Sequence, residues 1–290
     1  MQAGKLSFFK KSVTLWDGDA TMAIKLIVSD IDGTLIPYGE SGLPEGLFPL
    51  IRALHEAGIL FCPASGRQYH SLRALFAPVA DEIGYLCENG AVVMGVGGEE
   101  DAPLLSKTSM LPRGEAMALC EAIYAQQGCE VLISGERVCY LCPKDAGFAE
   151  LFRSATGNRI RLVERFSDIA EDVVKISSYS PGCLAAAKAA LGPRFAGTFH
   201  MAEAGPDWLD FTLADKGVGL RGLCAALGVT PAETAAFGDN WNDVAMLDIA
   251  GEAYLMSTAS PALRDRYPRQ CDNVLPVLEK ILRHNNEQQP

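Results

Sequence analysis

The sequence predicts an α/β protein in which a doubly wound, Rossmann-like parallel sheet is interrupted by an inserted α+β domain. Short apolar strands alternate with helical patterns in the first part of the chain and again near its end. Between these parts, neighbouring strand-like runs are separated by Gly-containing turns, a pattern typical of antiparallel hairpins. The length of 290 residues fits roughly two domains.

The first part of the chain reads as strand, helix and strand joined by short loops. An apolar run at 24–29 stops at Asp30, and the apolar residues at 47–54 recur at helical spacing up to Gly58. Such an order predicts a parallel βαβ unit. The expected elements are strands at 24–29, 59–64 and 85–87 and helices at 47–58 and 68–76.

The middle of the chain, residues 93–206, mixes hairpins with helices and predicts the inserted α+β domain. Its expected strands are 130–134, 137–142, 173–179 and 195–201, and its expected helices are 112–126, 147–155 and 183–191. After it the alternation resumes, with helices at 217–227 and 242–249 and strands at 235–237 and 253–256. The predicted domains are a leader at 1–21, a first core part at 22–92, the insert at 93–206 and a second core part at 207–290.

Composition excludes several classes of protein. The 25 basic and 36 acidic side chains give a formal net charge of −11, which disfavours nucleic acid as a partner because a phosphate backbone is held by clustered Lys and Arg. No run approaches the roughly 20 apolar residues that span a bilayer, and the N-terminus lacks a secretory signal pattern. We therefore expect a cytoplasmic protein that binds neither nucleic acid nor membrane.

The nine cysteines are an odd number scattered among apolar neighbours, which indicates reduced thiols. Cys139 and Cys142 form a Cys-x-x-Cys pair. No second pair completes a zinc site, so the sequence favours buried thiols there.

Polar clusters follow three expected strands of the two core parts. They occupy residues 30–34, 64–67 and 238–243, and a fourth cluster at 215–217 opens the helix after the insert. Each cluster alone is compatible with an ordinary turn or helix cap. In an open parallel sheet, however, ligands bind at the carboxyl ends of the strands, so this order favours one shared site.

Three carboxylates in these clusters predict a cation site. Asp30 and Asp32 follow the first strand, and Asp239 would join them. Neighbouring carboxylates cannot all ionise cheaply unless a cation lies between them. Oxygen ligands without His or Cys favour Mg²⁺ over zinc, and protein-bound Mg²⁺ commonly takes a phosphate oxygen, so the clusters also predict a phosphoryl substrate.

The other clusters suit that substrate. Ser65 offers a hydroxyl to a phosphate oxygen, Gly66 adds a main-chain amide near a helix N-terminus, and Lys216 supplies a positive charge. We also expect Lys216 to keep Asp30 ionised and nucleophilic at neutral pH.

Taken in order, the four clusters resemble the four motifs of the haloacid dehalogenase (HAD) superfamily of phosphatases. The insert after the second cluster resembles that of the Cof-like branch, which carries a type IIB cap. The resemblance extends from Met22 to about Leu282 and includes the Glu-Asn-Gly-Ala segment at 88–91. It implies a HAD core with an inserted type IIB cap, and Mg²⁺ as the cofactor.

The resemblance also implies residue roles. Asp30 matches the nucleophile that forms an aspartyl-phosphate, Asp32 the general acid and base, Ser65 the hydroxyl that holds the phosphoryl group, and Lys216 the lysine that balances charge. The implied phosphate-binding residues are Ile31, Ser65, Gly66, Lys216 and Asn242. The implied metal ligands are Asp30, Asp239 and the main-chain carbonyl of Asp32, and the implied supporting residues are Thr34, Asn242 and Asp243.

These observations lead to the hypothesis of a Mg²⁺-dependent phosphatase that hydrolyses a small phosphorylated metabolite, such as a sugar phosphate, through phospho-Asp30. Two alternatives stay open: a phosphosugar mutase on the same scaffold and a catalytically silent phosphometabolite sensor. The sequence leaves open whether the protein is a homo-oligomer. It favours a packing or surface role for His70. It does not rank three residues in or near the insert for substrate contact, namely Arg137, Trp208 and Asp210.

Overall fold

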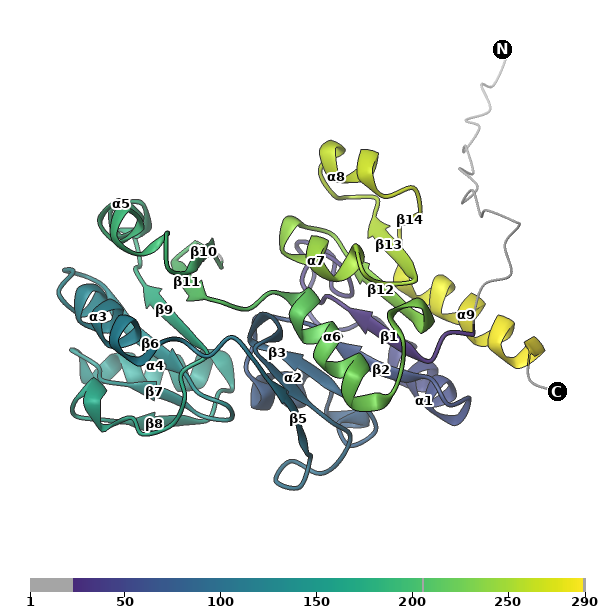
Figure 1. Ribbon diagram of the computed structural model, residues 1–290, viewed down its shortest axis with the longest axis horizontal. Helices are drawn as coiled ribbons and strands as arrows, with labels where there is room; N and C mark the ends of the chain where they lie inside the picture. Colours follow the sequence, from purple (N-terminus) through teal and green to yellow (C-terminus); the bar gives the residue numbers. More distant parts are fainter. Residues whose placement is uncertain (1–22, 205, 289–290) are drawn as a thin grey trace, which may run out of the picture.

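The structure is a computed structural model that describes residues 23–204 and 206–288. The expected leader at 1–21 lies outside these residues. Figure 1 shows two lobes side by side, a core built from the two ends of the chain and a cap built from its middle. Within the described ranges, no helix combines the length and apolar character needed to cross a membrane.

The core contains a five-stranded sheet in the order β14-β13-β12-β1-β2, and all its strands run parallel. Its central strand, β1, pairs with β12 on one side and β2 on the other. The inner strands are almost continuously apolar because helices cover both faces of the sheet. The strands are β1 (Leu26–Ser29), β2 (Leu60–Pro63), β12 (Thr234–Gly238), β13 (Glu252–Met256) and β14 (Gln270–Cys271).

Successive residues of β1 face opposite sides of the sheet, and each side packs on its own set of helices. Ile27 shares one apolar cluster with Leu278, whereas Val28 shares another with Leu220. The first side carries α1 (Leu47–Glu56), α2 (Tyr69–Leu75) and α9 (Val274–Gln288). The second carries α6 (Lys216–Leu227), α7 (Val244–Leu247) and α8 (Pro261–Arg266). The predicted doubly wound core is confirmed.

A small antiparallel sheet lies between the core sheet and the cap. It consists of β3 (Tyr85–Cys87), β4 (Val92–Met94) and β5 (Leu104–Lys107). Leu86 forms an isolated parallel bridge with Ala64, so β3 lies beside the chain that follows β2. The domain boundary expected at 92/93 falls inside β4, and β5 packs on α6 of the core. The chain therefore enters the cap later than expected, after this hairpin.

The cap is built on a six-stranded sheet in the order β10-β11-β9-β6-β7-β8, antiparallel except between β7 and β8. Its strands are β6 (Glu130–Ser134), β7 (Cys139–Leu141), β8 (Ile160–Leu162), β9 (Lys175–Tyr179), β10 (His200–Glu203) and β11 (Trp208–Thr212). Its helices are α3 (Arg113–Tyr124), α4 (Ala146–Thr156) and α5 (Leu184–Phe195). The predicted α+β insert is confirmed.

Two expected positions in the cap differ from the structure. A strand was expected at 195–201, but α5 continues to Phe195, which packs in the cap core, and β10 begins only at His200. The second domain boundary was expected at 206/207, but β11 follows it and pairs with β9 and β10. The chain therefore returns to the core after Thr212.

All nine cysteines are free thiols. Cys139 is fully buried in β7 and Cys142 lies just after that strand, half-buried. Burial raises the pKa of both thiols, as expected for packed side chains.

Candidate active site

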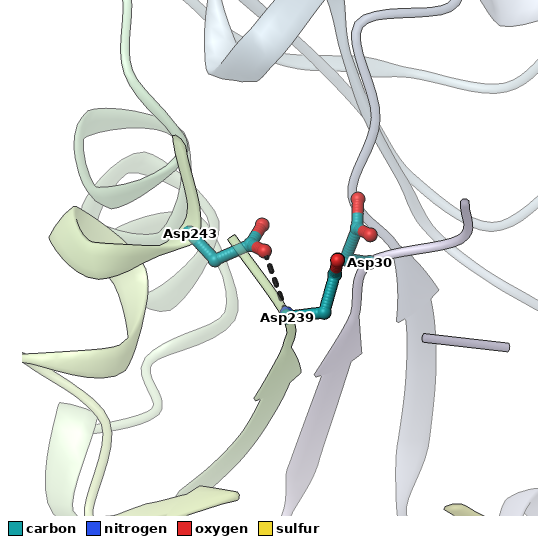
Figure 2. Close-up of side chains that lie close together, drawn as sticks. All are labelled: Asp30, Asp239 and Asp243. Atoms are coloured by element: carbon teal, nitrogen blue, oxygen red, sulfur yellow. Dashed lines mark hydrogen bonds between the residues drawn. The ribbon is translucent and has the colours of Figure 1, made fainter. Parts of the chain in front are cut away.

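The expected polar clusters meet at the carboxyl edge of the core sheet. Asp30 follows β1, Asp239 follows β12, and Ser65 lies just beyond β2. Because β1 lies between the other two strands, the three loops are neighbours. Figure 2 shows Asp30 and Asp239 next to each other at the ends of their strands, with Asp243 approaching from the neighbouring segment.

Lys216 supplies a buried positive charge beneath this edge. Its Nζ lies 2.5 Å from Asp30 Oδ1 and 2.6 Å from Asp243 Oδ1. Lys216 is the first residue of α6, and the preceding Asp215 caps that helix by accepting the N–H of Val218. Burial lowers the pKa of Lys216, but Asp243 and Asp30 outweigh this effect and hold the pKa above its usual value.

The ionisation of Asp30 differs from the sequence expectation. Burial, together with the charges of Asp243 and Asp239, raises the pKa of Asp30 to about 7, even though Lys216 lowers it. The charge of Lys216 therefore does not fully offset the rise in the pKa of Asp30 that burial and the two neighbouring carboxylates cause. Burial also raises the pKa of Asp239.

Carboxylate oxygens of Asp30, Asp239 and Asp243 lie within 4.8 Å of one another. Asp243 Oδ2 accepts the main-chain N–H groups of Asp239 and Asn240, each at 3.0 Å, while its other oxygen accepts from Lys216. Both oxygens of Asp243 thus have partners within the protein. Asp30 and Asp239 line the cavity, and their hard oxygens are the ligand type that suits Mg²⁺.

Two hydroxyl groups position these carboxylates. The Thr34 hydroxyl lies 3.2 Å from Asp30 Oδ2 and 3.3 Å from Asp239 Oδ1, and the Tyr38 hydroxyl donates to Asp239 Oδ2 at 2.8 Å. Gly33 has φ +95°, and a Cβ there would lie 2.5 Å from Asp239 Oδ2, so the turn requires glycine. Sequence reasoning identified Thr34 but missed Tyr38, whose loop carries no recognisable motif.

The Asp32 side chain turns toward Arg67 at the cavity wall. Arg67 Nη2 lies 2.9 Å and 3.2 Å from the two carboxylate oxygens of Asp32, and both residues line the cavity. The sequence analysis assigned Arg67 no role beyond its place in the cluster at 64–67. Its guanidinium fixes the orientation of Asp32.

The remaining expected phosphate-binding residues lie around the same cavity. Ser65, Gly66 and Asn242 line it, and Ser65 Oγ accepts the main-chain N–H of Arg67 at 3.3 Å. The side chain of Ile31 is fully buried in the core, so this residue can offer a ligand only its main chain.

The cavity has a volume of about 790 Å³ and lies between the core and the cap. Lys175, at the start of β9, ties the two together. Its Nζ donates to the Gly66 carbonyl at 2.8 Å and forms ion pairs with Glu88 at 2.6 Å and Asp210 at 3.5 Å. All three charged groups are buried, so this cluster fixes one wall of the cavity.

The structure shows which of the four further residues, His70, Arg137, Trp208 and Asp210, line the cavity. Trp208 and Asp210 line the cavity. Arg137 instead donates to the main-chain carbonyls of Glu99 and Ala102, and His70 Nδ1 lies 2.6 Å from Glu99 Oε1. Neither Arg137 nor His70 is among the residues that line the cavity.

Known proteins share this sequence pattern and fold. The family model of haloacid dehalogenase-like hydrolases matches residues 27–274. The 5-amino-6-(5-phospho-D-ribitylamino)uracil phosphatase YbjI of Escherichia coli is 27% identical over 271 residues, which cover 91% of this chain and 98% of the relative. The HMP-PP phosphatase of Cronobacter sakazakii is 26% identical over 255 residues, covering 86% and 88%. The solved structure of the HAD subclass IIB sugar phosphatase BT4131 shares the fold, with a TM-score of 0.66, 22% identity and coverage of 88% of this chain and 98% of that one.

Proposed function

The chain belongs to the haloacid dehalogenase-like hydrolases and is a phosphomonoester hydrolase, and we propose that it uses Mg²⁺ and forms a phospho-aspartate at Asp30. The single observation that supports this most strongly is the environment of Asp30. Its carboxylate lines the cavity, contacts the buried Lys216 and lies beside Asp239. A nucleophile needs this combination of access and charge balance.

The residues at the strand ends fit Mg²⁺. Asp30, Asp239 and the main-chain carbonyl of Asp32 would hold it, since Asp243 is engaged by Lys216 and two main-chain amides. When bound, Mg²⁺ would neutralise charge on the phosphoryl group and on the two carboxylates.

In the proposed first step, a carboxylate oxygen of Asp30 attacks phosphorus and the bond from phosphorus to the leaving oxygen breaks. Asp32 gives its proton to that oxygen. Water then attacks the phosphorus of phospho-Asp30 while Asp32 takes up a proton from it, the bond from phosphorus to the Asp30 oxygen breaks, and inorganic phosphate leaves the regenerated Asp30 carboxylate. In its ionised form Asp32 pairs with Arg67, which orients it at the cavity wall to take up the proton from water in the second step.

Positioning and charge balance account for most of the catalysis of phosphoryl transfer. Lys216 offers a fixed positive charge beside Asp30, and Ser65 and the Gly66 amide offer hydrogen bonds to phosphoryl oxygens. The Thr34 hydroxyl contacts Asp30 and the Asp243 carboxylate contacts Lys216, and these hydrogen bonds position the two side chains.

The substrate is a small phosphorylated metabolite. Both relatives described above are named as phosphatases of such compounds. A cavity of about 790 Å³ is far larger than a phosphate group needs, and it falls in the range typical of small-molecule sites. The cap wall therefore contacts the leaving group and selects among phosphomonoesters.

Phosphate release from p-nitrophenyl phosphate and a panel of sugar phosphates, with Mg²⁺ and with EDTA, tests this proposal. We expect release that depends on Mg²⁺ and is abolished by Asp30→Asn, while Asp265→Asn on the exposed surface of α8 leaves it unchanged. Transfer of phosphate between sugar positions without release would favour a mutase. Absence of turnover in the folded wild type would favour a silent sensor.

A further inference from the structure

The cap wall of the cavity carries an aromatic surface that the transfer of a phosphoryl group does not require. Trp208 of β11, Phe152 of α4 and Leu132 of β6 line the cavity together. The ring centroids of Trp208 and Phe152 lie 5.6 Å apart, and Trp208 also packs on Tyr179 at 4.7 Å. Neighbouring rings thus hold the indole in place, and it is a preorganised platform.

This surface lies on one particular face of the cap sheet. The opposite face packs on α3 and α5, whereas the face of Leu132 and Trp208 packs on α4 and also borders the cavity. The half-buried indole of Trp208 therefore faces the leaving group of a phosphomonoester whose phosphate lies at Asp30, and the buried ring of Phe152 supports this indole. Flat aromatic or heteroaromatic rings gain most from such a platform because they can stack on it.

Polar groups border the rings. Ser177 and Asp210, from β9 and β11, line the same cavity, and the Ser177 hydroxyl donates to Asp210 Oδ1 at 2.6 Å. A carboxylate has more acceptor positions than this bond uses, so Asp210 can accept a further N–H or O–H. A ring with nitrogen donors matches this combination better than a hydrocarbon ring does.

The charges around the cavity disfavour a second anionic group on the substrate. Its described lining has six carboxylates and two cationic side chains, Arg67 and Lys175. Arg67 is paired with Asp32, and Lys175 is paired with Glu88 and Asp210. Neither cation is left to neutralise a carboxylate or a second phosphate near the cap.

We propose, building on the phosphatase function above, that this enzyme prefers phosphomonoesters whose leaving group carries a flat, non-anionic nitrogen heterocycle stacked on Trp208. Trp208 is then a specificity-determining residue. The heterocycle is bound by ring stacking and by a hydrogen bond to Asp210, and simple sugar phosphates lack the first of these contacts.

Three related esters separate these features. Ribose 5-phosphate lacks a base, uridine 5′-phosphate adds a neutral heterocycle, and orotidine 5′-phosphate adds a carboxylate to that heterocycle; pyridoxine 5′-phosphate supplies a second ring type. We expect kcat/KM for at least one neutral heterocyclic ester to exceed that for ribose 5-phosphate by about 5- to 150-fold, the range for stacking of one base. We expect orotidine 5′-phosphate to be hydrolysed at least about tenfold less efficiently than uridine 5′-phosphate, as for a like-charge clash.

Variants assign the preference to Trp208. Trp208→Leu should lower kcat/KM for the heterocyclic ester at least about fivefold more than it lowers kcat/KM for ribose 5-phosphate, and Trp208→Phe should retain most of the advantage of the heterocyclic ester. Tyr124→Leu, which removes an aromatic ring packed on Phe166 away from the cavity, is the matched control and should keep the advantage.

The two proposals fail in different ways. If the wild type hydrolyses ribose 5-phosphate as well as both neutral heterocyclic esters, or if Trp208→Leu and Trp208→Phe lower all esters equally, the heterocycle inference is wrong and the phosphatase function stands. If no ester, including p-nitrophenyl phosphate, is hydrolysed, the phosphatase function itself fails.

Discussion

Replacing Lys216 by Met would remove the cation that lies between Asp30 and Asp243. Lys216 is 1% exposed, so water cannot take over its role. Breaking a buried ion pair by removing one partner costs about 3–5 kcal/mol because a charge is left uncompensated. We expect Lys216→Met to lower the free energy of unfolding by this amount, and kcat to fall by about 10²–10³-fold because a group that stabilises transition-state charge is lost.

Urea unfolding and phosphate release measure the two effects separately. In the double variant Lys216→Met/Asp243→Asn, one uncompensated carboxylate is removed, so we expect stability to recover by at least about 1 kcal/mol while activity stays low. Lys188→Met is the control, because Lys188 pairs with Glu203 at 2.6 Å with both side chains half exposed, and its loss should cost at most about 1 kcal/mol. Equal stability losses in Lys216→Met and Lys188→Met would refute this reasoning.

Three further predictions concern stability. Gly90→Ala should cost about 1–3 kcal/mol from backbone strain alone, because φ is +97° and a Cβ would lie 2.3 Å from the Asp215 carbonyl; urea unfolding measures it. Lys175→Met should cost about 3–5 kcal/mol by leaving two buried carboxylates without their cation, and a thermal melt above pH 5 that matches the wild type would contradict this. Hydrogen bonds from Lys25 and Thr230 lower the pKa of Glu233 to about 2 in the native state. The usual pKa of glutamate is near 4.5, so the ionised Glu233 contributes stability above that pH, and this contribution is lost as pH falls from about 4.5 to about 2. Lys25→Met should flatten that part of the curve of melting temperature against pH.

Local sequence patterns predicted most of the regular elements. The strand expected at 130–134 coincides with β6, and the helix expected at 217–227 begins one residue earlier, at Lys216. The expected elements did not include the strands β4, β5, β8, β11 and β14 or the helices α8 and α9. β8 and β14 are short and β8 is largely exposed, so neither carries a clear apolar pattern. The domain boundaries shifted because a hairpin's own residues do not indicate which sheet it will join.

The candidate site was predictable where chemistry is concentrated in short motifs. Asp30, Ser65 and Asp239 each follow a strand, and the parallel topology brings them to one edge. The ion pair of Asp32 with Arg67 was not predictable, because its geometry depends on how two loops approach each other. Local sequence also gives no measure of burial, which is why the raised pKa of Asp30 was not anticipated.

The cap contributions to the site depend on tertiary structure even more strongly. Lys175 reads in sequence as part of an apolar strand, and its carboxylate partners come from β11 and from the turn after β3. The sequence does not distinguish Trp208 from the other aromatic residues of the cap. Its place in the cavity follows from the pairing of β11 with β9. The residues of the cap that face the leaving group could therefore be identified only from the structure.

The most direct test of the central claim is to trap the intermediate. During turnover of p-nitrophenyl phosphate with Mg²⁺, borohydride would reduce an aspartyl-phosphate to homoserine, which peptide mass spectrometry can locate. Our account predicts homoserine at position 30, dependent on substrate and absent when borohydride is added to the enzyme alone. Sustained phosphate release with unmodified Asp30, or homoserine at another aspartate, would contradict it.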